Sequence, residues 1–329
     1  MKLVKKIFSI FFRFAIGLIL LVVLFKFKNI EAHSLLESIR NVNKPLLFLS
    51  FIVYSLIYVF CFLRWVMLLK TVKIHLPLKR VAISYAGGTF FSLFLPSTIG
   101  GDLARSIDLS AHTQRPREVV ATVLLDRLSG YAGLVIVALF SLIIGWDLIK
   151  EQKAAITMVA AISALLIIIL VVLFNEFLYS RINRLLHSPN AGKIREMITS
   201  LHQEIYVFRR HKKVIVNNLV LSVLVQAVVP LASYIMALSL GANFKPIYFF
   251  VFWPIIGAVT LMPISIGGLG VRENLAVFFF TRVGMSENLA LLIALLNFAF
   301  MLIYGAIGGL IYVLTVHHRR IQPHKPSPV

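Results

Sequence analysis

The residues best suited to chemistry lie in two short segments, 167 residues apart, that share one pattern. Residues 95–105 read LPSTIGGDLAR, and residues 262–272 read MPISIGGLGVR. Proline ends a helix because it lacks a backbone donor, and paired glycines permit a sharp turn and a close approach of backbones. A helix that restarts there presents free N–H groups and a positive dipole end, which bind anions. The arginine that ends each segment, Arg105 or Arg272, adds a guanidinium suited to phosphate.

We expect the two segments to form one site for an anionic head group, because they recur at matching places in the two halves of the chain. The candidate residues in and directly after them are Pro96, Thr98, Gly100, Gly101, Asp102, Arg105, Pro263, Ser265, Gly267, Gly268, Arg272 and Glu273. For Asp102 two roles stay open: it caps the helix that follows the turn, or it contacts the ligand. For the two segments, the alternative is a pair of kinks used for helix packing.

Two charged residues stand side by side in an apolar run, where Asp126 and Arg127 lie near the start of the stretch 119–144. A charge at the middle of a span costs about 2.5–3.5 kcal/mol on insertion scales, so such residues need partners. Adjacent side chains on a helix point about 100° apart, which gives these two different partners. We predict that Asp126 faces Arg105 or Arg272, while its neighbour faces the cavity. The alternative is a pair near the interface whose charges snorkel into water.

Three other features receive structural interpretations. Arg64, which precedes a tryptophan, is expected to snorkel from a helix end near the interface. Cys61, the only cysteine, lies in an apolar run and is expected to be a small buried residue. The glycines at 87–88 and at 305 and 309 are expected to give helices smooth faces for close packing.

Sequence motifs for hydrolysis, nucleotide binding and metal binding are absent. The sequence contains no HExxH, GxSxG or GxxxxGK[ST] pattern, and its nine histidines lack metal-ligand spacing. The apolar stretches also lack paired carboxylates suited to acid–base work. We therefore expect a protein that is not an enzyme and that needs no metal and no cofactor.

The composition of the chain indicates a membrane protein. Hydrophobic residues make up 59% of the 329 residues and charged residues 14%, whereas soluble domains have roughly 25% charged residues. These values exclude a soluble enzyme, a disordered chain and a fibrous repeat. The 33 Lys and Arg residues outnumber the 13 Asp and Glu residues, but they stand between apolar runs rather than over a water-exposed surface. We therefore expect no nucleic-acid partner.

The chain holds eight hydrophobic segments, of which six are long enough to cross about 30 Å of hydrocarbon. These six are 7–25, 46–69, 119–144, 154–177, 214–240 and 289–316. The other two, 81–95 and 247–262, end at the proline–glycine segments. The predicted fold is an all-α polytopic membrane protein with about six full spans and two broken re-entrant helices. Eight complete spans are the alternative.

The distribution of positive charge orients this fold. With a cytoplasmic amino terminus, and with each broken segment returning to its own side, 21 of the 33 Lys and Arg residues lie in the cytoplasm. If the segment 81–95 crossed completely, the eight basic residues of 181–213 would lie outside, against the rule. We therefore predict re-entrant segments and place both termini in the cytoplasm.

Residues 1–329 are expected to form a single membrane domain made of two halves. The first half, 1–177, contains the segment 95–105, and the second half, 214–316, contains the segment 262–272. In the predicted topology these segments enter the membrane from opposite sides. The halves then form an inverted repeat, which is typical of transporters whose broken helices build the binding site.

A basic segment, 178–213, connects the two halves, and a polar tail, 317–329, ends the chain. Apolar residues recur along the connecting segment at the spacing of one helix face: Ile194, Ile198, Leu201, Ile205 and Phe208. Two interpretations stay open. The segment is an amphipathic helix on the anionic cytoplasmic leaflet, or it is a loop helix packed on the bundle.

The run 87–105, GGTFFSLFLPSTIGGDLAR, resembles the hallmark of the lysylphosphatidylglycerol synthase transmembrane-region family of flippase-like integral membrane proteins. The pair at 126–127, the LRW run at 63–65 and residues 263–273 resemble its other signatures, so the resemblance covers nearly the whole chain. It implies a translocator in a prokaryotic inner membrane. Bifunctional members also carry a cytosolic aminoacyl-transferase domain. Because the tail 317–329 is too short for one, we expect the translocator part without the synthase.

The predicted function is translocation of an anionic lipid, or of a polyprenyl-phosphate-linked cargo, between the two leaflets of the membrane. The alternative is a non-transporting membrane subunit that recruits a glycosyltransferase or a lipid-modifying enzyme such as a lipid synthase. Membrane lipids are the expected partners in either case. The resemblance carries a role in the site over to Pro96, Gly100, Gly101, Arg105, Arg127, Gly267, Gly268 and Arg272.

Overall fold

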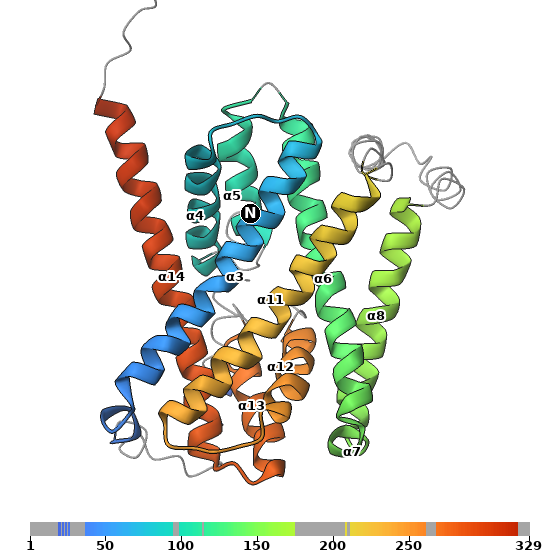
Figure 1. Cartoon of the computed structure of the whole chain (residues 1–329), viewed down its shortest axis with the longest axis vertical. Coiled ribbons are helices and arrows are strands. Elements are labelled where there is room, and N and C mark those ends of the chain that lie inside the picture. The colour runs from blue at the N-terminus through green and yellow to red at the C-terminus, as the bar shows by residue number, and fades with distance from the viewer. Residues whose placement is uncertain are drawn as a thin grey trace, which may run out of the picture.

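A computed structural model describes most of the chain and shows a helical bundle (Figure 1). It describes residues 19–20, 22, 24, 26, 37–94, 99–113, 115–174, 208, 211–260 and 268–321. Within these residues every regular element is a helix, which confirms the predicted all-α fold of a polytopic membrane protein. The predicted first span, 7–25, lies largely outside the described residues.

The helices fall into long and short elements. The long ones are α3 (Lys44–Thr71), α6 (Pro116–Ile144), α8 (Lys153–Phe174), α11 (Lys212–Ser239) and α14 (Glu287–Ile321). The short ones are α4 (Leu78–Phe94), α5 (Ile99–Ser110), α7 (Trp146–Ile149), α12 (Pro246–Thr260), α13 (Val271–Phe280) and the 3-10 helix η3 (Thr281–Val283). Among the described helices, α3, α6, α11 and α14 are long and apolar enough to cross a membrane, and α8 and α12 contain shorter apolar stretches.

Both predicted breaks in the apolar stretches separate two helices in the structure. The helix α4 runs from one end of the bundle to its middle, and α5 returns to the same end (Figure 1). The helices α12 and α13 do the same from the opposite end. Each broken pair therefore enters and leaves the bundle on one side, as a re-entrant element does.

The connections gather at the two ends of the bundle. The turns before α4 and before α6 lie at the upper end in Figure 1, together with the start of α11. The turns around α7, before α12 and before α14 lie at the lower end. The upper connections are those that the distribution of positive charge assigns to the cytoplasm. That orientation stays a prediction.

Close contacts between backbones hold the broken helices against their neighbours. On α14, a Cβ atom built at Gly308 would lie 2.7 Å from the carbonyl oxygen of Ala86 on α4. The prediction of close packing at the glycines of α4 and α14 is confirmed, since Gly87, Gly305 and Gly309 also leave no room for a Cβ atom. Small residues at such contacts let helices approach closely in a membrane.

The apolar core of the described residues has two parts. The larger cluster centres on α12 and α13, where Phe252 stacks on Phe279 and contacts Phe280 edge-to-face. The smaller cluster lies at the other end of the bundle, around Trp65 and Leu69 of α3. Three of the five ionisable side chains of the candidate site come from parts of α3 and α6 that lie between the residues of the two clusters, and the other two come from α5.

The basic segment 178–213 lies outside the described residues except for Phe208 and residues 211–213. Phe208 is the last residue of the predicted apolar face, and it is buried in the smaller cluster. At this residue the chain packs on the bundle. The interpretation of the rest of the segment as a helix on the leaflet stays a prediction.

Candidate functional site

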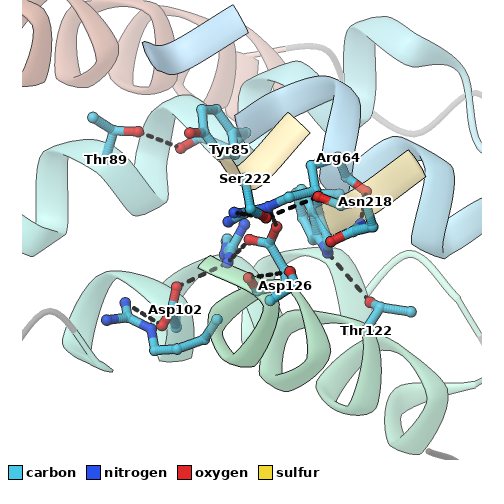
Figure 2. Close-up of polar contacts among 12 residues, drawn as sticks. Arg64, Tyr85, Thr89, Asp102, Thr122, Asp126, Asn218 and Ser222 are labelled. Carbon is cyan, nitrogen blue, oxygen red and sulfur yellow. Dashed lines mark hydrogen bonds and ion pairs between the residues drawn. The ribbon is translucent and has the colours of Figure 1, made fainter. Parts of the chain in front are cut away.

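Five ionisable side chains from three helices meet in the middle of the bundle (Figure 2). Arg64 comes from α3, Asp102 and Arg105 come from α5, and Asp126 and Arg127 come from α6. Charged groups inside the hydrocarbon region of a membrane are costly unless they are paired. Each of these five side chains is paired with another of the five. The network therefore forms a connected set of charges rather than a row of independent ones.

Asp126 is the centre of the network. Its Oδ1 accepts a hydrogen bond from Arg64 Nε at 2.5 Å, and its Oδ2 accepts one from Arg105 Nη2 at 2.7 Å. The side chain of Asp126 is 4% exposed and that of Arg64 is 6% exposed. Of the two partners predicted for Asp126, the structure places Arg105 beside it, whereas Arg272 pairs with a different carboxylate.

The structure corrects the expectation that Arg64 snorkels from a helix end to the membrane interface. It lies seven residues, or about two turns, before the end of α3, and it is buried. Its Nη1 donates a hydrogen bond to Ser222 Oγ at 2.9 Å, and Asn218 Nδ2 donates one to its backbone carbonyl at 3.2 Å. Gly130 leaves room for the guanidinium, since a Cβ atom there would lie 3.1 Å from Nη1.

Arg105 is held between a carboxylate side and an aromatic side. Its Nη2 lies 2.9 Å from Asp102 Oδ1 in addition to its bond with Asp126. Its guanidinium carbon lies 4.8 Å from the centre of the Trp65 ring and 5.7 Å from that of Tyr85. Its Nε is buried and has no hydrogen-bond partner in the part of the chain that the structure describes.

Asp102 and Arg127 form the more accessible half of the network. Asp102 bonds to Arg127 Nη2 with one oxygen and to Arg105 with the other. Their side chains are 20% exposed for Arg127 and 16% for Asp102, several times more than the pair at Asp126. Arg127 also donates a hydrogen bond to the Tyr131 hydroxyl at 2.9 Å. As predicted, Asp126 and Arg127 have different partners.

These side chains line a cavity of about 410 Å³. Its wall includes Arg64, Asp102, Arg105, Asp126 and Arg127. Three guanidinium groups and two carboxylates leave an excess of one positive charge. A cavity with this charge balance favours an anion, and arginine binds phosphate through two N–H groups at once.

Several further residues of the cavity wall were not predicted from the sequence. Tyr85 of α4, Tyr131 of α6 and the sole cysteine, Cys61 of α3, line the cavity. Cys61 was expected to be a small buried residue, but it is partly exposed on this wall. The sequence does contain a signal that places Tyr131 in this wall. It follows Arg127 by four residues, and residues four apart share one helix face.

The structure confirms one of the two roles predicted for the glycine pair of the first segment, the close approach of backbones. Gly100 and Gly101 lie inside the first turn of α5. A Cβ atom at Gly101 would lie 2.3 Å from the carbonyl oxygen of Gly88 on α4, so this glycine serves the close approach of two helices. The predicted residues Pro96 and Thr98 lie outside the described residues.

The second segment leads into α13 and shows the predicted turn. Gly268 has a φ of +76° and Gly270 a φ of +80°, a conformation that favours glycine. Glu273 is fully buried, and its Oε2 accepts a hydrogen bond from the Gly270 backbone at 2.6 Å. Its Oε1 accepts one from Arg272 Nη2 at 2.9 Å. Glu273 thus stabilises the start of its own helix. Predicted residues outside the described part are Pro263, Ser265 and Gly267.

Arg272 lines a second, smaller cavity of about 160 Å³. Tyr54 and Gln226 belong to the walls of both cavities, so the two cavities are neighbours. The two segments were expected to form one site. The structure instead places Arg105 at the larger cavity and Arg272 at the smaller one.

Among the described residues, no group of three or more His, Cys, Asp or Glu side chains is close enough together to hold a metal ion.

Comparison with known proteins gives one match. A family model described as "Lysylphosphatidylglycerol synthase TM region" matches residues 10–309. The match includes both glycine-pair segments and all five side chains of the charged network. Searches of curated proteins and of solved structures return no match.

Proposed function

Because the chain belongs to the lysylphosphatidylglycerol synthase transmembrane-region family, whose function is lipid-related, we propose that it translocates an anionic lipid between the leaflets. The observation that carries the proposal is the charged cavity of about 410 Å³ in the middle of a bundle of apolar helices. Such a cavity offers a lipid phosphate a polar path where the surrounding bilayer offers none.

The phosphate binds at the accessible half of the network. Arg127 and Arg105 supply the donors closest to this role, since both residues line the cavity. Without a ligand, Asp102 pairs with both arginines, and an entering phosphate competes with it for them. The buried pair of Arg64 and Asp126 anchors the network from behind.

Two features of the architecture support movement of the cargo across the membrane. The pair α4–α5 enters from one end of the bundle and α12–α13 from the other, with one cavity at each pair (Figure 1). Transporters built from inverted halves expose such sites alternately by rocking one half against the other. The positive residues at the upper end support an orientation with that end in the cytoplasm, and a prokaryotic inner membrane is the location that we propose.

A leaflet assay on the reconstituted protein tests the proposal. The probe is fluorescent phosphatidylglycerol in vesicles, with quenching of the outer leaflet by an impermeant reductant. We expect Arg127→Gln to slow the exchange of label at least tenfold, because it removes a charge that the phosphate needs. The matched control is Arg282→Gln, which removes an arginine at an exposed position beside Phe278.

The outcome decides between the candidate functions. Exchange at the wild-type rate in both Arg127→Gln and Arg105→Gln contradicts the role of the charged cavity. A wild-type protein that leaves the lipid in its original leaflet contradicts translocation, and it favours the alternative of a membrane subunit that recruits a glycosyltransferase or a lipid-modifying enzyme.

A further inference from the structure

We propose that α4, α5 and the part of α14 from Gly305 onward form one rigid unit, and that motion of this unit against α3, α6 and α11 opens the larger cavity. The inference rests on the proposed function, and it names the helices that move when the site changes sides. It assigns α14, a helix of the second half of the sequence, to the same unit as α4 and α5, which belong to the first half.

The helices α4 and α14 interlock through glycines that lie on both of them. A Cβ atom built at Gly87 of α4 would lie 2.5 Å from the Tyr312 ring of α14. Conversely, a Cβ atom at Gly309 of α14 would lie 2.3 Å from the Phe90 ring of α4. Each ring therefore fills a recess in the opposite helix. Close-packed surfaces of this kind do not slide past each other without a clash, so the two helices move together.

A polar cluster outside the candidate site joins all three helices of the unit at the upper end in Figure 1. Asp108 of α5 accepts hydrogen bonds from Arg80 and Ser84 of α4 through its Oδ2. Its Oδ1 accepts one from the Tyr312 hydroxyl of α14 at 3.2 Å. Arg80 and Ser84 are buried. Separation of a buried ion pair is costly, so the three helices that share Asp108 stay together.

The helices α3, α6 and α11 are joined to one another by contacts of the same two kinds. Arg64 of α3 donates a hydrogen bond to Ser222 of α11 at 2.9 Å, and Trp65 of α3 donates one to Thr122 of α6 at 3.2 Å. A Cβ atom at Gly133 of α6 would lie 2.6 Å from that of Ser222. These three helices therefore form the group against which the unit moves.

The larger cavity lies between the unit and this group. Its wall comes from α4 and α5 on one side and from α3, α6 and α11 on the other, and α14 contributes Met301. The ion pairs of Asp102 with Arg127 and of Arg105 with Asp126 join the two sides. An anion that takes the place of Asp102 on Arg127 replaces one of these links. Binding in the cavity therefore changes the contact between the unit and the group.

The lower part of α14 attaches the unit to the rest of the bundle. The Tyr304 hydroxyl donates a hydrogen bond to the Phe51 carbonyl of α3 at 2.7 Å. The next residue, Gly305, already packs against α4, since its Cβ atom would lie 2.3 Å from Leu93. The contacts of α14 change from one group to the other at this point. Because helices bend most readily at glycine, the pivot of the unit lies here.

A disulfide between α4 and α14 tests the rigid unit. The variant Phe90→Cys/Gly309→Cys is made in the background Cys61→Ser, which removes the native thiol. A Cβ atom at Gly309 would lie 2.7 Å from Phe90 Cγ, so the two new cysteines are close enough to bond. Exchange of fluorescent phosphatidylglycerol is measured in vesicles after oxidation and again after reduction. We expect the two rates to agree within about 2-fold, because helices of one rigid body keep their distance.

The opposite result has a clear meaning. If α14 moves away from α4 during the cycle, the disulfide stops exchange, and a loss of about tenfold or more that reduction reverses overturns the rigid unit.

Spin labels measure the same motion without transport and without a change at the glycine contact. In the same background, one pair of labels joins Leu78→Cys of α4 to Val313→Cys of α14. A second pair joins Leu78→Cys to Val120→Cys of α6, and all three positions are exposed. On addition of excess phosphatidylglycerol we expect a shift of the distance between α4 and α6 and no shift between α4 and α14. The control pair, Val120→Cys with Val216→Cys of α11, is expected to stay unchanged. Equal shifts of the first two pairs, or no shift of either, overturn the inference.

Failure of this inference is distinguishable from failure of the proposed function. A reduced protein that does not exchange lipid, with a shift between α4 and α6 alone, contradicts translocation and keeps the rigid unit. Exchange by the reduced protein that the disulfide stops rejects the rigid unit and keeps translocation.

Discussion

A single carboxylate holds two guanidinium groups in the middle of the bundle. Asp126 bonds to Arg64 at 2.5 Å and to Arg105 at 2.7 Å, and all three side chains are almost completely buried. Buried ion pairs give little net stability, but removal of one partner leaves a buried charge without compensation. Asp126 is therefore the residue on which the arrangement of the arginines depends.

Replacement of this carboxylate is expected to destabilise the protein strongly. The variant Asp126→Asn removes the charge that compensates Arg64 and Arg105, at a cost of about 3–5 kcal/mol. We expect a clearly lower melting temperature in a fluorescence-detected thermal scan. The control is Asp147→Asn, which breaks a pair with Lys150 on the surface and is expected to leave the melting temperature nearly unchanged. Equal melting temperatures of the two variants would contradict a central role of Asp126.

Some of these contacts follow from the sequence and others do not. The pair of Asp126 and Arg105 is predictable, because a charge inside an apolar stretch demands a partner and an arginine follows the first break. The role of Arg64 depends on how α3 crosses α6 and on the space that Gly130 leaves, and no local pattern encodes either. Likewise, no sequence pattern shows that the buried Nε1–H group of Trp253 has no hydrogen-bond partner in the described part of the chain.

At the scale of elements, the lengths of the apolar stretches and the breaks within them predict the helices correctly, because each feature has a direct physical cause. A stretch of about 20 apolar residues forms a spanning helix, and α3, α6, α11 and α14 match four of the predicted spans. Proline and glycine mark the ends of α4 and α12 for the same kind of reason. At a glycine pair the sequence allows either a turn or a close approach of backbones, and the structure shows that Gly101 serves a close contact with another helix.

The contact between α4 and α5 is expected to be sensitive to one methyl group. In Gly101→Ala the new Cβ would lie 2.3 Å from the Gly88 carbonyl, so the two helices must separate. Overpacking of this kind costs about 1–3 kcal/mol, and we expect a lower melting temperature. In the control, Gly257→Ala, the Cβ would lie 3.3 Å from the flexible end of Leu134. Gly257→Ala is expected to keep the wild-type melting temperature, and a similar fall in both variants would contradict the close contact.

At the scale of the whole molecule, the two broken pairs divide the bundle into two halves with different chemistry. The pair α4–α5 contributes Asp102 and Arg105 to a positively charged cavity, whereas α13 contributes Arg272 to a neutral one. The repeated sequence pattern therefore does not produce two equal sites. In the proposed function, the phosphate binds at the positively charged cavity of the half that contains α4 and α5.

If these cavities are exposed alternately to the two sides of the membrane, the reactivity of the sole cysteine can be predicted. Cys61 lines the larger cavity, so a small impermeant thiol reagent reports on which side that cavity faces. If the halves rock against each other, Cys61 in the wild type reacts from both sides of the membrane, measured in right-side-out and inverted vesicles. Excess phosphatidylglycerol is expected to slow the reaction from each side, because the lipid fills the cavity. Cys61→Ser supplies the unlabelled baseline. A cavity that serves only to bind lipid would react from one side alone, and that result would separate a lipid-binding subunit from a translocator.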